Sequence, residues 1–494
     1  MDISQIVKKI KLYWFGMEKT DQLIIFVLIF SFLIRIAFLF YSPLRGWDET
    51  VYLNLGRDLS RNPFSYSLLN SPWNDFIPST DIIYGWPNIG FRAPLLPYIL
   101  SIFYALNLNF LIPIIVPFFA TLSVFLVYIF GKKLFDKKIG LYSAILFSLA
   151  PIQVFYSEKI WTDPLIVFFI LLTFISFWEG YEKENKKHKI LFGLFLALSL
   201  LARYTTLWIA PVFLFYFLIR DKSLRFLKDK YLWQAIGIFF LTLIPWFIYG
   251  FVYYGNPLGG FIHGFQAANY WGGAQSWSFF FENSWKIFSI AGILFLTSLF
   301  YIFFKKEFLK REIYLLLIWI IFFSSIVMAM PHKEERFILP IVPAVCLISG
   351  FFISKLEKYK NIIFGLACII LAVSLWSSFK IAYENSQAGA NLCFSDGNEF
   401  LANDSISENS LVVTNQLPIV HYYTQKEVRL YPASWNLKAL ENISDSDQRN
   451  KKIYFFYSNY DMKDVAIKKD LDDNFKKVFE CSKGEGYSAI YEYE

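Results

Sequence analysis

The sequence predicts an all-α polytopic membrane domain of about eleven transmembrane helices, followed by a small C-terminal α/β domain. Of its 494 residues, 56% are hydrophobic and 21% are aromatic, whereas soluble proteins average roughly 45–50% apolar residues. Long apolar runs recur through residues 1–383, and Lys and Arg gather in short clusters between them. Residues 384–494 have the mixed composition of a soluble domain. We therefore expect a membrane domain over 1–383 and a soluble domain over 384–494.

The apolar runs are about 20 residues long, which suffices to cross a bilayer. They occur near 22–41, 111–131, 139–157, 163–178, 232–252, 287–304, 313–330, 338–354 and 362–382. Two stretches are ambiguous. Residues 93–107 are short and contain prolines, and residues 190–219 are too long for one upright span.

The basic clusters resolve both ambiguities, because Lys and Arg collect in short cytoplasmic loops. All clusters fall on one side only if 93–107 does not cross and 190–219 crosses twice. The prediction is then eleven spans in the cell membrane, with a cytoplasmic N-terminus and an extracytoplasmic C-terminal domain. Residues 93–107 become an amphipathic or re-entrant helix within the first outer loop, 42–110. The first span is expected to be retained rather than removed as a signal peptide.

Arg203 lies where the doubled crossing turns. Two helices of about 14 residues each rise only about 21 Å, which is less than a hydrocarbon core of about 30 Å. A cation at that depth costs about 2.5–3.5 kcal/mol unless it is paired or hydrated. We expect Arg203 to meet an anionic group; the alternative is a side chain that extends outward to water.

The predicted outer face collects charges of both signs near span ends. The acids are Asp48, Glu49, Glu158 and Asp163, and the cations are Arg92, Lys333 and Arg336. Such a face suits a reaction in which an acid or a base works beside a bound anion. The alternative is that each is a solvated loop charge.

The first outer loop contains an amphipathic helix that begins at Asp48. Its apolar positions Val51, Tyr52, Leu55 and Leu59 follow helical spacing. Asp48 is then expected near the helix N-terminus, where backbone N–H groups favour its charged form. Without the cations on the same face, Asp48 would be read as a cap alone.

Two other segments carry weaker signals. Residues 253–286 are rich in Gly and aromatic residues, which fits a substrate lid or a plain membrane-surface loop equally well. In the tail, "SLVVTN", "HYYTQ", "KIYFFYS" and "SAIYEY" are expected to be strands, while "NLKALENI" and "DVAIKKDLDDNFKKVF" have helical character. A disulfide between Cys393 and Cys481 is left open, because the sequence does not give their separation.

Several chemistries are not indicated. The net charge of +7 comes largely from the clusters that set orientation, so nucleic acid is not an expected partner. His and Cys form no metal-ligand cluster, and the nucleotide fingerprints and the G-x-S-x-G elbow are missing from the sequence. No cofactor or metal is expected.

Five motifs in order resemble those of polytopic glycosyltransferases of superfamily C (GT-C) that use lipid-monophosphate sugars, namely the protein O-mannosyltransferases and the lipid A aminoarabinose transferases. "WDETVYLNLGRDL" resembles their first-loop motif, in which Asp-Glu is followed three residues later by Tyr, here Asp48, Glu49 and Tyr52. The other four are "GFRAPLLPYIL", "KIWTDPLIVFF", "LSLLARYTTLWIAP" and "HKEERFILPIVPAVCLI". Together they extend over about residues 15–355.

The resemblance implies an inverting transfer of one sugar, mannose by preference, from a dolichyl or polyprenyl phosphate to a glycan, protein or lipid acceptor outside the cytoplasm. Asp48 would be the general base, with Asp163 and Glu49 as the other catalytic acids. The lipid phosphate would bind to Arg203, Lys333, Arg336 and Arg92. Weaker substrate contacts would come from Tyr52, His263 and Gln266.

The chain departs from the family pattern at two of these positions. The basic-Pro-Pro segment reads Arg92-Ala93-Pro94, and Arg203 replaces the usual Lys, which changes the geometry of phosphate contact. Three alternatives stay open: an oligosaccharyltransferase, whose Asp-x-Asp and Trp-Trp-Asp motifs the chain lacks; a transporter or lipid flippase, which predicts internal repeats; and an inactive homologue.

Overall fold

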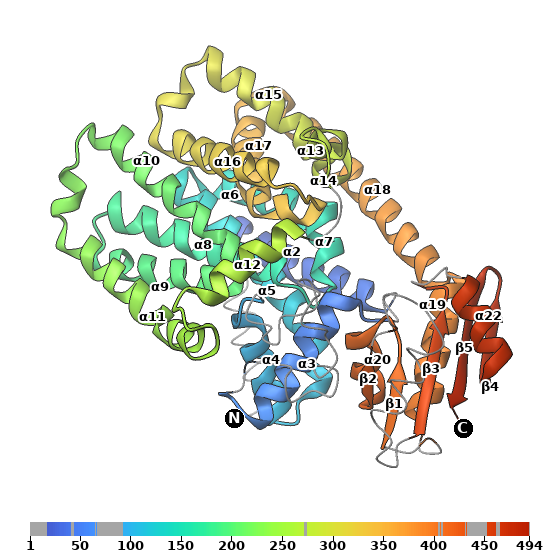
Figure 1. Cartoon of the computed structure of the whole chain (residues 1–494). Helices are drawn as coiled ribbons and strands as arrows, with labels where there is room; N and C mark the ends of the chain where they lie inside the picture. Colours follow the sequence, from blue (N-terminus) through green and yellow to red (C-terminus); the bar gives the residue numbers. More distant parts are fainter. Residues whose placement is uncertain are drawn as a thin grey trace, which may run out of the picture. The chain divides into compact units, whose positions relative to one another are not determined.

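The computed structural model describes residues 17–40, 44–64, 66, 92–270, 274–403, 406, 409–429, 431, 452–460 and 465–493. Its contacts divide the chain into two compact units, whose helices and strands are labelled in Figure 1. The helical unit comprises Met1–Phe38 and Pro113–Phe379, and the mixed unit comprises Leu39–Ile112 and Lys380–Glu494. The predicted boundary at residues 383 and 384 is a division by membrane location, which these contacts do not test, and it stays a prediction.

The helical unit consists of α-helices joined by short 3₁₀ segments (η). Its elements are α2 (Lys19–Leu39), α5 (Ile112–Leu134), α6 (Lys137–Ser148), α7 (Pro151–Ser157), α8 (Thr162–Tyr181), α9 (Lys186–Ala202), η5 (Tyr204–Ile209), α10 (Ala210–Asp221), η6 (Arg225–Lys228), α11 (Lys230–Tyr254), α12 (Gly259–Tyr270), α13 (Phe279–Glu282), α14 (Ser284–Phe288), α15 (Ile290–Phe304), η7 (Glu307–Leu309), α16 (Arg311–Ala329), η8 (Glu335–Ile341), α17 (Val342–Lys355), η9 (Glu357–Tyr359) and α18 (Lys360–Ser386).

Each of the eleven predicted spans coincides with a helix or a helix pair. Within the described residues, seven helical segments are long and apolar enough to cross a membrane, and an eighth is added if α6 and α7, bent by 58°, form one span. The remaining three predicted spans are α9, α10 and α15, with 17, 12 and 15 residues. The chain is thus a multi-pass membrane protein, and its helices break at Arg203 as predicted.

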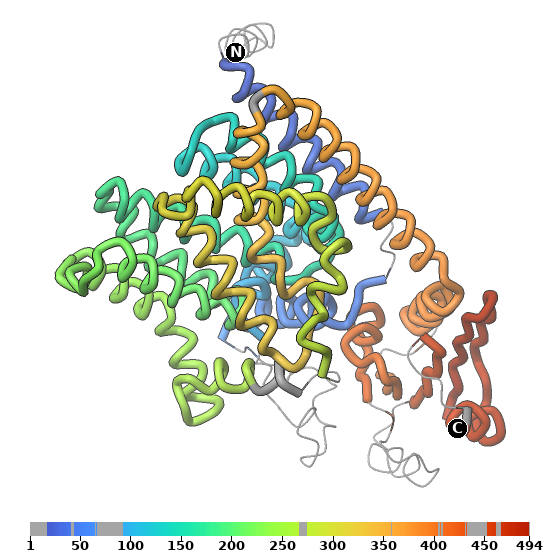
Figure 2. Tube along the Cα trace, turned by 90° about the horizontal axis from the view of Figure 1, so that it is seen from above, coloured from blue at the N-terminus to red at the C-terminus, as the bar shows by residue number. Residues whose placement is uncertain are grey.

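Burial distinguishes the helices at the centre of the unit from those at its edge. In α8, 83% of the apolar window is buried, against 17% in α18 and 22% in α2. Figure 2 shows α2 and α18 running alongside each other, and Phe38 packs edge-on against Phe379 at a centroid distance of 5.0 Å. A helix that is apolar all round and buried forms a core. The large apolar side chains exposed on α2 and α18 are suited to contact lipid.

Close helix approach in this unit depends on small residues, as is usual in membranes. At Gly193 of α9, a Cβ atom would collide with the carbonyl of Ala235 in α11. The packing of α9 against α11 therefore requires glycine at this position.

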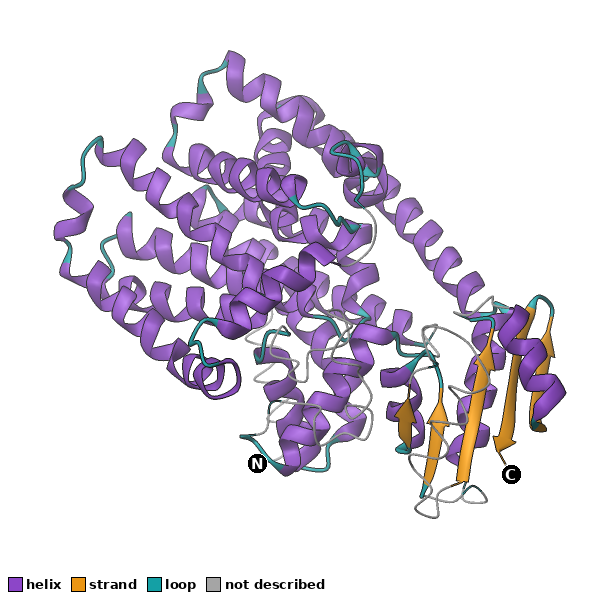
Figure 3. Ribbon diagram, viewed as in Figure 1, coloured by secondary structure: helices purple, strands orange, loops and turns teal. Residues whose placement is uncertain are grey.

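The mixed unit holds the first outer loop and the C-terminal domain. Its elements are α3 (Trp47–Arg61), α4 (Leu95–Ala105), η4 (Asn109–Leu111), α19 (Gly389–Ala402), β1 (Ser410–Val413), α20 (Leu417–Thr424), β2 (Glu427–Arg429), β3 (Lys452–Ser458), α22 (Val465–Asn474), β4 (Lys476–Lys483) and β5 (Gly486–Tyr493). The strand order is β2-β1-β3-β5-β4 (Figure 3). β1 is parallel to β2 and β3, while β5 is antiparallel to β3 and β4.

Alternate residues of β3 face opposite sides of this sheet, as a pleated strand requires. Phe455 joins the cluster that includes Ile467 and Leu471 of α22, and Phe456 stacks on Phe394 of α19 at 5.1 Å. Helices thus cover both faces. This is the α/β domain that the sequence predicts.

One predicted strand in the tail is wrong, and one predicted helix is shorter than expected. "HYYTQ" lies mostly in α20, a helix whose first turn contains Pro418, a position where proline favours a helix start. "DVAIKKDLDDNFKKVF" divides into α22 and the start of β4. The predicted helix "NLKALENI" lies outside the described residues.

The first outer loop contributes the two helices α3 and α4. All four apolar positions predicted for α3 are buried, and Leu53, Asn54 and Gly56 are buried as well, so α3 is more enclosed than a surface helix. A Cβ at Gly56 would lie 2.7 Å from the Cβ of Leu100 in α4. At 11 residues, α4 is too short to span a bilayer, which agrees with the prediction that 93–107 does not cross.

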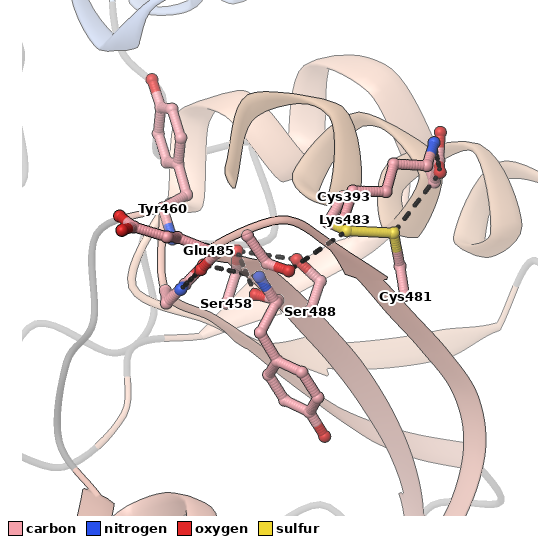
Figure 4. The surroundings of a disulfide bond; sticks show 11 residues. Cys393, Ser458, Tyr460, Cys481, Lys483, Glu485 and Ser488 are labelled. Atoms are coloured by element: carbon pink, nitrogen blue, oxygen red, sulfur yellow. Dashed lines mark hydrogen bonds and ion pairs between the residues drawn. A yellow bond between two sulfur atoms is a disulfide. The ribbon is translucent and has the colours of Figure 1, made fainter. Parts of the chain in front are cut away.

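Cys393 of α19 and Cys481 of β4 form a disulfide across a Cα–Cα distance of 5.4 Å and a sequence separation of 88 (Figure 4). The bond links the helix that covers one face of the sheet to its edge strand. Near it, Lys483 pairs with Asp396 at 2.6 Å, and Ser458 shares a hydrogen bond with Ser488 at 2.8 Å.

Replacing both cysteines, Cys393→Ala with Cys481→Ala, should destabilise the C-terminal domain by about 2–5 kcal/mol, because the crosslink restricts the unfolded chain. The measurement is thermal unfolding of purified protein in detergent, with proteolysis of residues 384–494 as the readout.

The control is Cys368→Ala, because Cys368 is a free cysteine in α18. This variant should leave the proteolysis of the C-terminal domain unchanged. Equal resistance of the double variant and the wild type would show that the bond does not stabilise the domain.

Candidate active site

Asp48 lies in the first turn of α3, in the mixed unit. Its Oδ1 accepts a hydrogen bond from Nη2 of Arg92 at 2.6 Å, and the two side chains are 17% and 18% exposed. A charge-assisted pair of this kind favours the ionised carboxylate. Asp48 is therefore held in the form that a general base needs, at a position that is still partly accessible.

Glu49, its neighbour, is only 1% exposed. Its Oε2 accepts from the backbone N–H of Gly46 at 2.9 Å, and its Oε1 pairs with Arg45 at 3.1 Å. Glu49 thus makes the reciprocal bond of a capping box, and the N-cap itself is Gly46 rather than Asp48. The placement of Glu49 favours a positioning role, and its predicted catalytic role stays a prediction.

Tyr52 is buried one turn further along α3. The guanidinium of Arg92 lies over its ring at 5.6 Å, within the range of a cation–π contact. Tyr52 therefore supports Arg92, the residue that pairs with Asp48.

In the helical unit, Asp163 lies in the first turn of α8 with its side chain 2% exposed. It accepts a hydrogen bond from Nη1 of Arg203, and Nη1 of Arg336 lies 3.9 Å from its other oxygen. One buried carboxylate thus binds two of the predicted phosphate ligands. The attraction between the carboxylate and the two guanidinium groups offsets the desolvation free energy of placing these charges inside the protein.

Both of these guanidinium groups also lie over aromatic rings. Arg336 is 3.9 Å from the ring centroid of Trp161, and Arg203 is 4.6 Å from that of Phe337. Cation–π contacts fix the plane of a guanidinium and leave its edge to form hydrogen bonds. Trp161 and Phe337 adjoin predicted site residues, but one sequence does not reveal which aromatic lies beneath which cation.

Lys333 is 5% exposed. Its ammonium donates to two backbone carbonyls, Met330 at 2.7 Å and Gln275 at 3.1 Å. Among the ion pairs of the described residues, none includes Lys333. An ammonium has three N–H donors, and two of them are used by these carbonyls, so the third is available to an anion.

Gln275 belongs to the Gly-rich segment and contacts the turn that contains Lys333. Its side-chain oxygen accepts from the backbone N–H of Lys333 at 2.6 Å, and its own N–H donates to Pro331 at 3.0 Å. Gln275 could not be predicted, because nothing in the sequence marks one glutamine as the partner of a turn 58 residues away.

Glu334 pairs with Arg336 at 2.7 Å and hydrogen-bonds to His332 at 3.0 Å. Burial alone would raise the pKa of its carboxyl, but the charge and hydrogen bonds of Arg336 outweigh that effect and lower the pKa. Glu334 therefore stays ionised and holds Arg336 from the side away from Asp163.

The other predicted residues lie apart from these clusters. His263 of α12 packs against the ring of Tyr254 at 4.5 Å. Gln266 lies in the same helix, but its side chain is outside the described part. Glu158 is buried and pairs with Lys159 at 2.9 Å.

The predicted residues therefore form two clusters, one in each unit. The first contains Asp48, Glu49, Tyr52 and Arg92, and the second contains Asp163, Arg203 and Arg336. Lys333 lies in the turn just before Arg336, with Met330 and Gln275 as its partners. Within the described ranges, no group of three or more His, Cys, Asp or Glu could hold a metal ion. Metal independence stays a prediction.

The fold is that of the polytopic glycosyltransferases of superfamily C. Over 95% of this chain and 97% of the other, it superposes on ArnT from Cupriavidus metallidurans bound to undecaprenyl phosphate, with a TM-score of 0.75 and 11% sequence identity. The archaeal oligosaccharyltransferase AglB from Archaeoglobus fulgidus, in complex with an inhibitory peptide and a dolichol-phosphate, matches over 94% of this chain and 74% of its own, with a TM-score of 0.56 and 14% identity.

Sequence comparison agrees with the fold. Residues 91–249 match the family described as dolichyl-phosphate-mannose-protein mannosyltransferase. An uncharacterized protein of Aquifex aeolicus is 28% identical over 53% of this chain and 54% of its own length. The alpha-1,2-mannosyltransferase ALG9 of Mus musculus is 28% identical over 28% of this chain and 24% of its own. The chain thus spans about half or less of these relatives, and the predicted resemblance to glycosyltransferases is confirmed.

Glu334→Gln should lower the stability of the helical unit by about 1–2 kcal/mol at pH 7, because hydrogen bonds to a charged partner are lost at a partly exposed site. The folded-state pKa of Glu334 is lowered, so its contribution is present above the unfolded-state pKa and is lost as pH falls through the folded-state pKa. Thermal unfolding at pH 7 and at pH 3 should show the difference between variant and wild type shrinking in acid.

The matched control is Glu335→Gln, one residue further on. Glu335 pairs with Lys286, whose side chain is 67% exposed, and exposed pairs contribute about 0–1 kcal/mol. A loss at position 335 equal to that at position 334 would contradict the role given to the Glu334–Arg336 pair.

Proposed function

We propose that this protein transfers a single sugar from a dolichyl or polyprenyl monophosphate to an acceptor hydroxyl or amine outside the cytoplasm, with inversion. The observation that carries the proposal is the state of Asp48, which is paired with Arg92 and partly exposed, whereas its neighbour Glu49 is buried. Support also comes from the fold neighbours, which bind undecaprenyl phosphate and dolichol-phosphate.

In this mechanism Asp48 accepts the proton of the acceptor while the acceptor oxygen or nitrogen attacks the anomeric carbon. The bond between that carbon and the phosphate oxygen breaks, and the electron pair leaves with the phosphate. Attack from the side opposite the leaving group inverts the centre. Arg92 balances the charge of Asp48 before the proton arrives.

The departing lipid phosphate gains negative charge, which Lys333, Arg203 and Arg336 would stabilise. Lys333 is the strongest candidate, because its ammonium contacts only backbone carbonyls among the described residues. A guanidinium has five N–H donors, so Arg203 can bind a phosphate oxygen while it stays bound to Asp163. Asp163 would orient the two arginines.

The proposed orientation places the C-terminal domain outside the cytoplasm of a cell membrane. The Cys393–Cys481 bond supports this placement, because disulfides persist in oxidising compartments. Mannose is the proposed sugar on the strength of the mannosyltransferase family that matches residues 91–249. The acceptor is proposed only as a glycan, protein or lipid.

Two alternatives lead to different products. An oligosaccharyltransferase would transfer a preassembled glycan, and AglB has a related fold, but the first-loop acids here read Asp48-Glu49 rather than Asp-x-Asp. A transporter or flippase would form no glycosidic bond. Incubating purified protein with a panel of lipid-phosphate sugars and cell-envelope acceptors, followed by mass spectrometry of the product, distinguishes all three.

Asp48→Asn should lower kcat by about 10²- to 10⁴-fold, the contribution of a general base. Donor binding should persist, because the proposed phosphate ligands are unchanged. Initial rates of transfer together with direct binding of the lipid-phosphate sugar provide the measurement.

A matched control lies in the same helix. Burial raises the pKa of Asp58, so Asp58→Asn replaces a carboxyl already biased toward its neutral form, about 15 Å along α3. This variant should keep transfer activity. Undiminished transfer by Asp48→Asn would contradict the role of Asp48 as general base.

Arg203→Ala should raise the KM for the lipid-phosphate donor about tenfold or more, since a hydrogen bond to a charged group contributes about 1.5–3 kcal/mol. Arg203→Lys should recover part of this loss, because it keeps the charge but not the planar fork.

Arg220→Ala provides the comparison for stability. Arg220 also pairs with carboxylates, Glu182 and Asp221, at the end of α10, so its loss should affect unfolding without changing the KM for donor. An unchanged donor KM in Arg203→Ala would remove Arg203 from the phosphate site.

A further inference from the structure

The C-terminal domain packs directly on the helix that carries Asp48. Helix α20 contacts α3, and both belong to the same compact unit together with α4. Because α4 packs on α3 as well, α3 is enclosed between a helix of the first outer loop and a helix of the C-terminal domain.

One polar contact of this interface lies at the middle of α3. Asn54 is fully buried, and its Nδ2 donates to the carbonyl of Pro418 in α20 at 3.0 Å. Its Oδ1 accepts from Arg57 at 2.9 Å. A buried amide with both ends engaged permits little sliding of one helix along the other, because sliding would leave polar atoms unpaired.

A second contact fixes the chain just before α3 begins. The backbone N–H of Arg45 donates to the hydroxyl of Tyr423 in α20 at 2.8 Å. Burial raises the pKa of Tyr423 to about 12, so the phenol stays neutral at physiological pH. The next N–H, that of Gly46, donates to Glu49. Two successive backbone N–H groups are thus hydrogen-bonded, the first to the C-terminal domain and the second within α3.

We infer that the C-terminal domain is a positioning element of the active site: through Tyr423 and Pro418, α20 sets where α3 begins and therefore where the carboxylate of Asp48 lies against Arg92. This inference rests on the proposed function. Tyr423 is a positioning residue, since it acts through the backbone at Arg45, three residues before Asp48. Its effect should appear in kcat, because a displacement of about 1 Å at reacting groups can cost about 10²-fold.

The test is Tyr423→Phe, which removes only the hydroxyl, in the purified full-length chain. The expected result is a fall in kcat of about tenfold with an unchanged KM for the lipid-phosphate donor. Amide hydrogen exchange at residues 45–50 should increase. This second readout does not depend on activity.

The matched control is Tyr491→Phe in the same domain. Tyr491 lies in β5, away from the contacts of α20 with α3. Its hydroxyl donates to Asp472 at 2.9 Å. This variant also removes one hydrogen-bonded tyrosine hydroxyl from the domain, so its melting temperature should fall, while kcat and exchange at residues 45–50 stay at wild-type values.

Three outcomes would overturn the inference: a wild-type kcat in Tyr423→Phe, an equal loss of kcat in Tyr491→Phe, or unchanged exchange at residues 45–50. Failure of the proposed function itself has a different signature. It would appear as full transfer by Asp48→Asn, whatever the exchange measurement shows in Tyr423→Phe.

Discussion

The helical unit depends on neutralising two guanidinium groups at one buried carboxylate. Arg203 follows α9 in an extended conformation, and Arg336 lies in the first turn of η8, yet both bind Asp163 at the start of α8. An unpaired cation at a membrane helix end is costly, so this pairing brings three helix ends together. The packing of η8 on α8 and of η5 on α9 and α16 follows from the same convergence.

The carboxylate that organises the cations also competes for them. Arg203 and Arg336 cannot give all their donors to a phosphate while Asp163 is ionised, and Glu334 holds Arg336 from a further side. Such restraint would limit the proposed anion binding to ligands that match the remaining N–H donors in geometry as well as charge. Lys333 differs, because its partners are neutral carbonyls. In the proposed function, the charge of Lys333 would attract the lipid phosphate, while the geometry of the two arginines would select it.

Much of the fold was predictable because it depends on local patterns. Apolar run length and basic clusters located the long apolar helices of the helical unit, including the break at Arg203, and alternation located β1, β3 and β5. Helices α12 and α19 were not predicted. "HYYTQ" was misassigned because its aromatic content outweighed the proline that precedes it. For the site, the residue types were predictable but their partners were not. Asp163 and Arg203 are 40 residues apart, and Arg45 and Tyr423 are 378 apart. One sequence contains no record of such pairings.

Gly56 determines how closely α3 approaches α4. Its lack of a side chain lets α3 touch Leu100 of α4, and Asp48 lies eight residues away, about 12 Å along the axis. A helix moves as a rigid rod, so a methyl group added at position 56 would tilt α3 and displace the Asp48 carboxylate at its start. The position of the Asp48 carboxylate thus depends on the room that Gly56 leaves between α3 and α4.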